Sequence, residues 1–185
     1  MKKHDKKFLK NLSDYGTLYY LVGVVEVTLR ERMIMTLRNL ASQRNRGEWF
    51  AVLPEEKQFK DFLARAITQN NGKLDGLEIY LPFLFWRNLF SNRHYTTLWI
   101  PIAHIVFAGL EDQSSRESFL KVQEHIVIIH KIRNRVAHYD FEGSGEFVYE
   151  KEILFWFIQA LGNNLRFYAV MSINHLTNLR LTFNL

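Results

Sequence analysis

The sequence predicts an all-α fold, a compact bundle of five or six helices. Apolar residues recur at helical spacing over long stretches, whereas no alternating pattern of strand length occurs. Only 3 prolines and 9 glycines interrupt the 185 residues, and 48% of the residues are hydrophobic, which excludes a disordered chain. This length fits one domain with its own core. We therefore expect a single domain over residues 1–185, with its core in about residues 15–170.

The first long helix is expected from about residue 15 to residue 41, capped by Ser13 or Asp14. Its apolar positions are three or four residues apart: Leu18, Leu21, Val22, Val25, Leu29, Met33 and Leu37. The preceding basic segment and the apolar run of residues 15–25 superficially resemble a signal peptide. Acidic residues interrupt that order and no cleavage site follows. The segment is therefore predicted to begin a helix of a soluble protein.

Three further segments follow. A second helix should begin near Pro54, since proline suits the first turn of a helix, and should end at Asn70-Asn71-Gly72. Residues 77–90 are apolar and predict a central part of the core. Their aromatic residues are Tyr80, Phe83, Phe85, Trp86 and Phe90. Residues 95–110 form another apolar segment, in which Pro101 forces a kink or a boundary.

The last two helices are marked by their ends. Ser114-Ser115-Arg116-Glu117 matches a capping box and predicts a helix over about residues 115–138. A turn over residues 140–145 should precede a final helix over about residues 147–171, with a possible bend at Gly162. Residues 174–185 remain ambiguous.

The helix of residues 115–138 has two distinct faces. At 100° per residue one broad arc is apolar and should face the core, with Phe119, Val122, Ile126, Ile129, Ile132 and Val136. His130, Asn134 and His138 are four residues apart and form a polar stripe. Leu120 and Val127 lie on the same side of the helix as this stripe, nearer its start. An apolar patch next to a polar stripe indicates a contact surface. Arg133 lies between stripe and arc, where an arginine is most often a structural ion-pair partner, for instance of Glu26.

The segment Arg133-Asn134-Arg135-Val136-Ala137-His138 resembles the signature of HEPN ribonucleases. That signature is an arginine, a polar residue and a histidine a few positions later, after a long apolar helix. Residues 15–170 are also similar to the Abi-type abortive-infection branch of that family, through residues 26–30, residues 81–86 with Tyr95 and Trp99, and the motif itself. The resemblance implies an RNA-cleaving toxin or antiviral defence protein. It would act as a homodimer with a composite active site and have an antitoxin or regulatory protein as a possible partner.

The implied chemistry needs no metal or cofactor. The 2′-hydroxyl of RNA attacks the neighbouring phosphate, and His138 transfers the proton. Arg133 holds the phosphoryl oxygens, and Asn134 orients the histidine or binds phosphate. His130, Arg135, Arg30 and Glu26 are further candidates for substrate binding, Arg135 toward the RNA backbone or solvent. HEPN toxins paired with nucleotidyltransferase antitoxins have tyrosine two places after the histidine; here it is one place early, at Tyr139, which disfavours that antitoxin type.

The alternatives are a catalytically inactive HEPN-like module that binds RNA or nucleotide, and a helical scaffold for a protein partner. The net charge of +5 is compatible with binding to a polyanionic partner, but it could equally serve only to keep the protein soluble. Metal hydrolysis is disfavoured, since His130 and His138 lie ~12 Å apart along a helix. No cysteine is present and no stretch reaches the ~18 apolar residues of a membrane span, so a cytoplasmic protein is expected.

Overall fold

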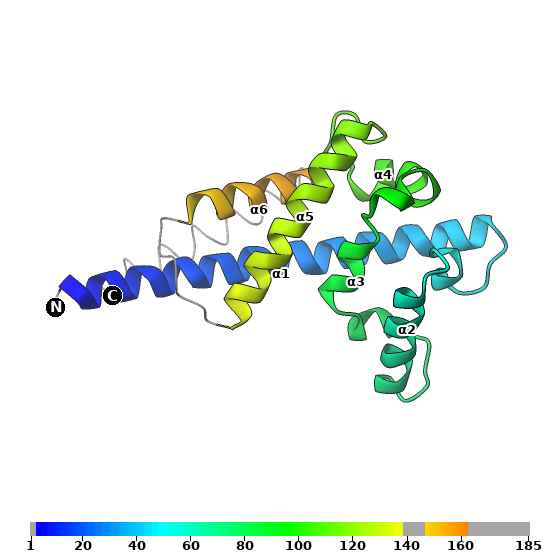
Figure 1. Cartoon of the computed structure of the whole chain (residues 1–185), viewed down its shortest axis with the longest axis horizontal. Helices are drawn as coiled ribbons and strands as arrows, with labels where there is room; N and C mark the ends of the chain where they lie inside the picture. The colour runs from blue at the N-terminus through cyan, green and yellow to red at the C-terminus, as the bar shows by residue number, and fades with distance from the viewer. Residues whose placement is uncertain (1–2, 139–146, 163–185) are drawn as a thin grey trace.

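One helix runs the length of the molecule and the others pack along it (Figure 1). The computed structural model describes residues 3–138 and 147–162, with side chains from Ser13 onward. Six α-helices and no strand occur in these residues, which confirms the predicted all-α fold. The α-helices are α1 (Lys3–Gln43), α2 (Lys57–Gln69), α3 (Phe83–Asn88), α4 (Ile100–Val106), α5 (Arg116–Ala137) and α6 (Val148–Leu161). Short helical turns join them: η1 (Trp49–Val52), η2 (Leu77–Tyr80), η3 (Asn92–His94) and η4 (Tyr95–Trp99).

Helix α1 begins earlier than predicted, and neither Ser13 nor Asp14 caps it. No proline interrupts the sequence before Ser13, so nothing there ends a helix. Asp14 instead accepts a hydrogen bond from Lys151 Nζ at 2.7 Å, which ties α1 to α6. The predicted apolar positions of α1 are all buried, and the helix contacts η1, α4, α5 and α6. The helix is therefore the spine of the bundle.

The aromatic segment of residues 77–90 is interrupted rather than one element. Leu81 and Pro82 are extended between η2 and α3, because proline fixes φ and restricts the residue before it. Phe83, Phe85, Trp86 and Phe90 are buried as predicted. The prediction for Tyr80 is wrong, since its side chain is 41% exposed. The short helix α3 is thus anchored by large rings on its inner side.

The predicted starts of two helices differ from the structure, by three residues for α2 and by one for α5. Helix α2 begins at Lys57 instead of near Pro54, and its N-cap residue Glu56 makes no capping hydrogen bond. Helix α5 is capped by Ser115, not Ser114, since Ser115 Oγ accepts from the amide of Ser118 at 3.1 Å. Both helices keep their predicted places in the chain, so only their first turns differ.

The boundaries at Pro101 and at residues 70–72 are confirmed. Pro101 lies in the first turn of α4, directly after the π-helical turn η4. Asn71 and Gly72 have φ of 54° and 78°, the left-handed conformation that ends α2. Helix α6 ends at Leu161, and Gly162 has φ of 148°. The predicted turn of residues 140–145, the continuation of the last helix to residue 171 and residues 174–185 lie outside the described residues.

One core cluster contains buried side chains from Tyr15 to Leu161. The loop after α4 joins it through a close backbone approach: the amide of Gly109 donates to Ala160 O at 3.0 Å. A Cβ at this glycine would overlap the carbonyl oxygen of Gln159, so only glycine fits here. This contact fixes the end of α4 against α6, on the side of α1 where α5 also packs (Figure 1).

Candidate functional site

Helix α5 carries the residues of the predicted site. Because one side of this helix is buried, the side chains on its opposite side must point away from the core. The six residues of the predicted apolar arc are all buried. They pack this helix against α1, α3 and α6. Because the arc is fixed in the core, the stripe of His130, Asn134 and His138 faces outward.

Asn134 and His138 are both exposed to solvent. His138 is the C-cap residue of α5, and its backbone amide donates to Asn134 O at 3.1 Å. A histidine at this end of a helix interacts favourably with the helix dipole when protonated, typically by ~0.3–1 kcal/mol at an exposed site. The imidazole itself is therefore accessible, and nothing in its described surroundings buries it.

Arg133 forms the ion pair that its position predicts. Its Nε lies 3.9 Å from Glu26 Oε2 of α1, and the two side chains are 40% and 27% exposed. Such a long and partly exposed pair contributes about 0–1 kcal/mol. Arg30 lies four residues after Glu26 on α1 and is partly buried, so it shares the face of α1 next to this pair. Arg133 and Glu26 are thus brought together beside α5, and Arg30 lies one turn farther along α1.

Arg135 is directed toward α6. Its Nη2 donates to Glu150 at 2.8 Å, and its guanidinium lies 5.5 Å from the centre of the Phe147 ring. The expectation that Arg135 faces RNA or solvent is wrong for this arrangement, because its charge is already paired at the α5–α6 contact. Its Nε is buried without a hydrogen-bond partner among the described residues. This side chain holds two helices together.

His130 has a neighbour that the sequence did not indicate, Arg87 at the end of α3. Arg87 Nη1 lies 3.1 Å from His130 Nδ1, and the His130 ring stacks on Phe83 at 5.9 Å. Since a guanidinium only donates, Nδ1 accepts and the ring proton is on Nε2. Burial lowers the pKa of His130, and the charges of Arg87 and Arg133 lower it further. The imidazole is therefore neutral at pH 7.

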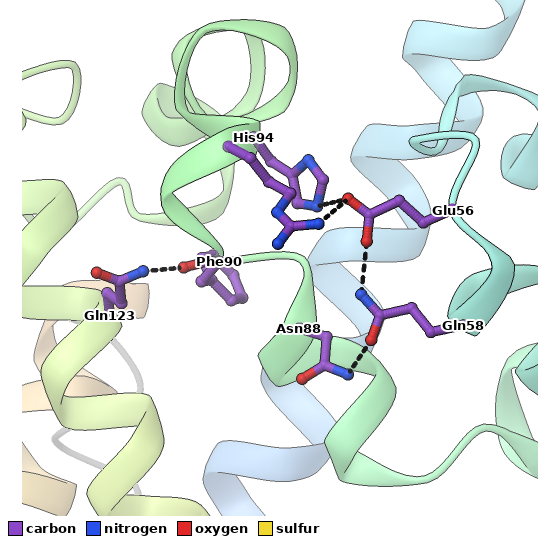
Figure 2. A network of polar contacts seen from close by, with 7 residues as sticks. Glu56, Gln58, Asn88, Phe90, His94 and Gln123 are labelled. Carbon is purple, nitrogen blue, oxygen red and sulfur yellow. Dashed lines mark hydrogen bonds and ion pairs between the residues drawn. The ribbon is translucent and has the colours of Figure 1, made fainter.

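A polar network extends from Arg87 to α2, and Figure 2 shows its part from Asn88 to Glu56. Arg87 donates to Asn88, Asn88 to Gln58, and Gln58 to Glu56, at 3.3, 3.1 and 2.6 Å. On the side of α5, Gln123 donates to the carbonyl of Phe90 at 2.7 Å. The carboxamides are thus fixed in orientation between α2, α3 and α5. The spacing of these residues does not predict the network, because the bonds that join α3 to α2 and α5 to Phe90 connect residues 30 and 33 positions apart.

At the far end of that network, the carboxylate of Glu56 contacts two further basic side chains. It lies 3.4 Å from Arg93 Nη1 and 3.2 Å from Nε2 of the buried His94. The second contact falls outside hydrogen-bond geometry, and His94 Nε2 has no other described partner. Burial lowers the pKa of His94, although Glu56 opposes that shift. The neutral form of His94 is therefore the stable one in this region.

Within residues 3–138 and 147–162, no three His, Asp or Glu side chains gather closely enough to hold a metal ion. Over the same residues, no helix combines the length and the apolar character that crossing a membrane requires. Comparison with protein-family models, with curated proteins and with solved structures finds no match for this chain. The resemblance to HEPN ribonucleases accordingly depends on the residues of the chain alone.

Proposed function

We propose that this protein is a metal-independent endoribonuclease of the HEPN type, and that it acts in toxicity or antiviral defence. One observation carries the proposal: Arg133, Asn134 and His138 are all accessible at one end of α5, while the arc beneath them is buried. A cation, an amide and an imidazole together at a surface suit the cleavage of a phosphodiester.

The reaction requires two proton transfers and a place for negative charge. An imidazole removes the proton of the 2′-hydroxyl, and the oxygen attacks the adjacent phosphorus. The bond to the 5′-oxygen breaks, and an imidazolium supplies its proton, leaving a 2′,3′-cyclic phosphate and a 5′-hydroxyl. His138 is suited to the proton transfers, because its imidazole is exposed and an imidazole can both accept and donate a proton.

Arg133 is suited to bind the phosphate that is cleaved. Its pair with Glu26 is long and partly exposed, so a phosphodiester can compete for the guanidinium at small cost. Two N–H groups of one guanidinium can hold two phosphoryl oxygens as charge builds on them. Asn134, next in sequence and exposed, can orient the imidazole or donate to the same phosphate.

The test is cleavage by the purified protein in excess EDTA. Single-stranded and structured RNA should be cut at the same rate with and without the chelator, because no step needs a metal ion. Loss of cleavage in EDTA that Mg²⁺ restores would contradict the proposal. Tight RNA binding without any cleavage would favour the inactive binding module instead.

We further propose a homodimer in which two copies of α5 face each other, so that one copy supplies the acid and the other the base. The apolar side chains Leu120 and Val127 support it, being 45% and 37% exposed in the sector that continues into the polar stripe. Two such patches related by a two-fold axis would cover each other and bring the stripes together.

Light scattering at micromolar concentration should give a dimer mass. Leu120→Asp should give a monomer with reduced cleavage, since a carboxylate in a dry contact is costly. Ile105→Asp, at a similarly exposed apolar residue of α4, is the matched control and should remain dimeric. A monomeric wild-type protein that still cuts RNA would refute the composite site.

A further inference from the structure

A polar cleft lies next to the stripe of α5, between α3, η3 and the first half of α5. Its volume is about 360 Å³, and its lining includes Gln58, Arg87, Asn88, Arg93, Gln123 and Val127. Val127 belongs to the same outward sector of α5 as His130, Asn134 and His138. The cleft therefore borders the sector of α5 that carries the candidate site, and its residue Arg87 contacts His130 of the stripe.

The polar groups of the cleft are held in place before any ligand arrives. The chain of donors runs from Arg87 to Asn88 and Gln58 and ends on the carboxylate of Glu56. Figure 2 shows this chain from Asn88 onward. Each carboxamide in it has one defined orientation, because its oxygen accepts on one side and its nitrogen donates on the other. Gln123 of α5 is held by a single hydrogen bond, which its nitrogen donates to the carbonyl of Phe90. Such a fixed set of polar groups reduces the entropy lost on binding.

The charge of the cleft is unbalanced at Arg87. This partly buried guanidinium contacts His130 Nδ1 at 3.1 Å and Asn88 Oδ1 at 3.3 Å, both neutral groups. Arg93 and Arg133 each have a carboxylate nearby, but no carboxylate pairs with Arg87 among the described residues. A partly buried cation without a counter-charge favours an anionic ligand. The lowered pKa of His130, due in part to Arg87 and Arg133, is consistent with a positive potential here.

We propose that this cleft binds a phosphate of the same RNA strand, several nucleotides away from the scissile one, with Arg87 as its main contact. The inference depends on the proposed ribonuclease function and extends it to a substrate subsite. From Val127 to His138 the axis of α5 spans roughly 16 Å. Stacked nucleotides rise ~3.4 Å each along a strand, so several can lie along this helix. The carboxamides of the cleft have the donors and acceptors that meet base edges.

The test measures binding of a fluorescent single-stranded RNA to protein carrying His138→Ala, so that no cleavage interferes. Adding Arg87→Ala should weaken binding about tenfold, the loss of one charge-assisted phosphate contact. The slope of log Kd against log salt concentration should fall by roughly 0.7, the value for one phosphate contact to a single strand. Arg65→Ala, at an exposed arginine of α2 outside the cleft, is the control and should leave Kd within twofold.

Ser91→Asp tests the same cleft without breaking the network. Ser91 lines the cleft and is the N-cap residue of η3, a position where aspartate is well tolerated. The added carboxylate should neutralise the cleft and weaken binding to a similar extent, with an unchanged circular dichroism spectrum. This variant decides the matter if Arg87→Ala disturbs the fold.

Each outcome has a distinct meaning. Binding and salt slope that match the Arg65→Ala control in both folded variants would overturn the cleft proposal, even if the wild type cuts RNA. Wild-type protein that binds no RNA would also overturn it. Binding that depends on Arg87 in a protein that never cuts RNA would uphold the cleft and refute the nuclease.

Discussion

Replacing His138 with alanine is expected to lower the rate of RNA cleavage by ~10²–10⁴-fold, the usual contribution of a general acid or base. The fold should be unaffected, because the side chain is exposed at the C-cap of α5 and buries nothing. Its interaction with the helix dipole limits the stability loss to about 1 kcal/mol. The measurement is single-turnover cleavage of a labelled RNA by both proteins, with thermal unfolding as the check on folding.

His104→Ala is the matched control for that experiment. His104 is also exposed near the end of a helix, but it lies on α4, away from the stripe. Its removal should leave the rate within twofold, so an equal loss in both variants would point to a general effect of losing a histidine. Full activity of His138→Ala would exclude the site on α5.

Phe85→Ala is expected to lower the free energy of unfolding by ~3–5 kcal/mol, the range for removing a buried phenylalanine. Phe85 is 0% exposed and lies at the centre of the aromatic cluster. The ring has four aromatic neighbours at centroid distances of 4.9–6.3 Å, Trp86, Phe59, Phe62 and Trp49. Because α3 also carries Arg87, RNA binding should fall together with stability.

Urea unfolding at 25 °C measures the effect. Domains of this size are typically stable by about 5–15 kcal/mol, so the variant should be marginal or unfolded in buffer. Ile79→Ala is the control just before α3: its side chain is 67% exposed, and the change should stay within about 0.5 kcal/mol. A loss below 1 kcal/mol for Phe85→Ala would mean that the aromatic cluster is not the core it is taken to be.

The sequence predicts buried residues most accurately in long helices, where the helical spacing of apolar residues continues over several turns. The arc of α5 and the apolar positions of α1 are predicted residue by residue, because burial follows directly from helical spacing. The starts of α1, α2 and α5 are less accurate. At a helix start several residues can serve as the cap, and tertiary contacts select among them, as when Asp14 binds Lys151 instead.

The candidate site is predictable only in part, for the same reason. The pair of Arg133 with Glu26 follows from the place of each residue on its helix face. Arg87 beside His130 joins residues 43 positions apart, and no local pattern connects them. The pattern of α5 alone predicts that Arg135 faces outward, whereas α6 supplies Glu150 on that side. Contacts between helices therefore decide which of the charged residues are free to bind a ligand.

The most direct measurement compares two RNA oligonucleotides in EDTA that differ by one oxygen, the 2′-hydroxyl at the scissile position. If the neighbouring ribose supplies the nucleophile, the all-ribose strand is cut to a 2′,3′-cyclic phosphate and the 2′-deoxy strand stays intact at that position. Equal cleavage of both strands would contradict the mechanism, and with it the roles given to Arg133 and His138.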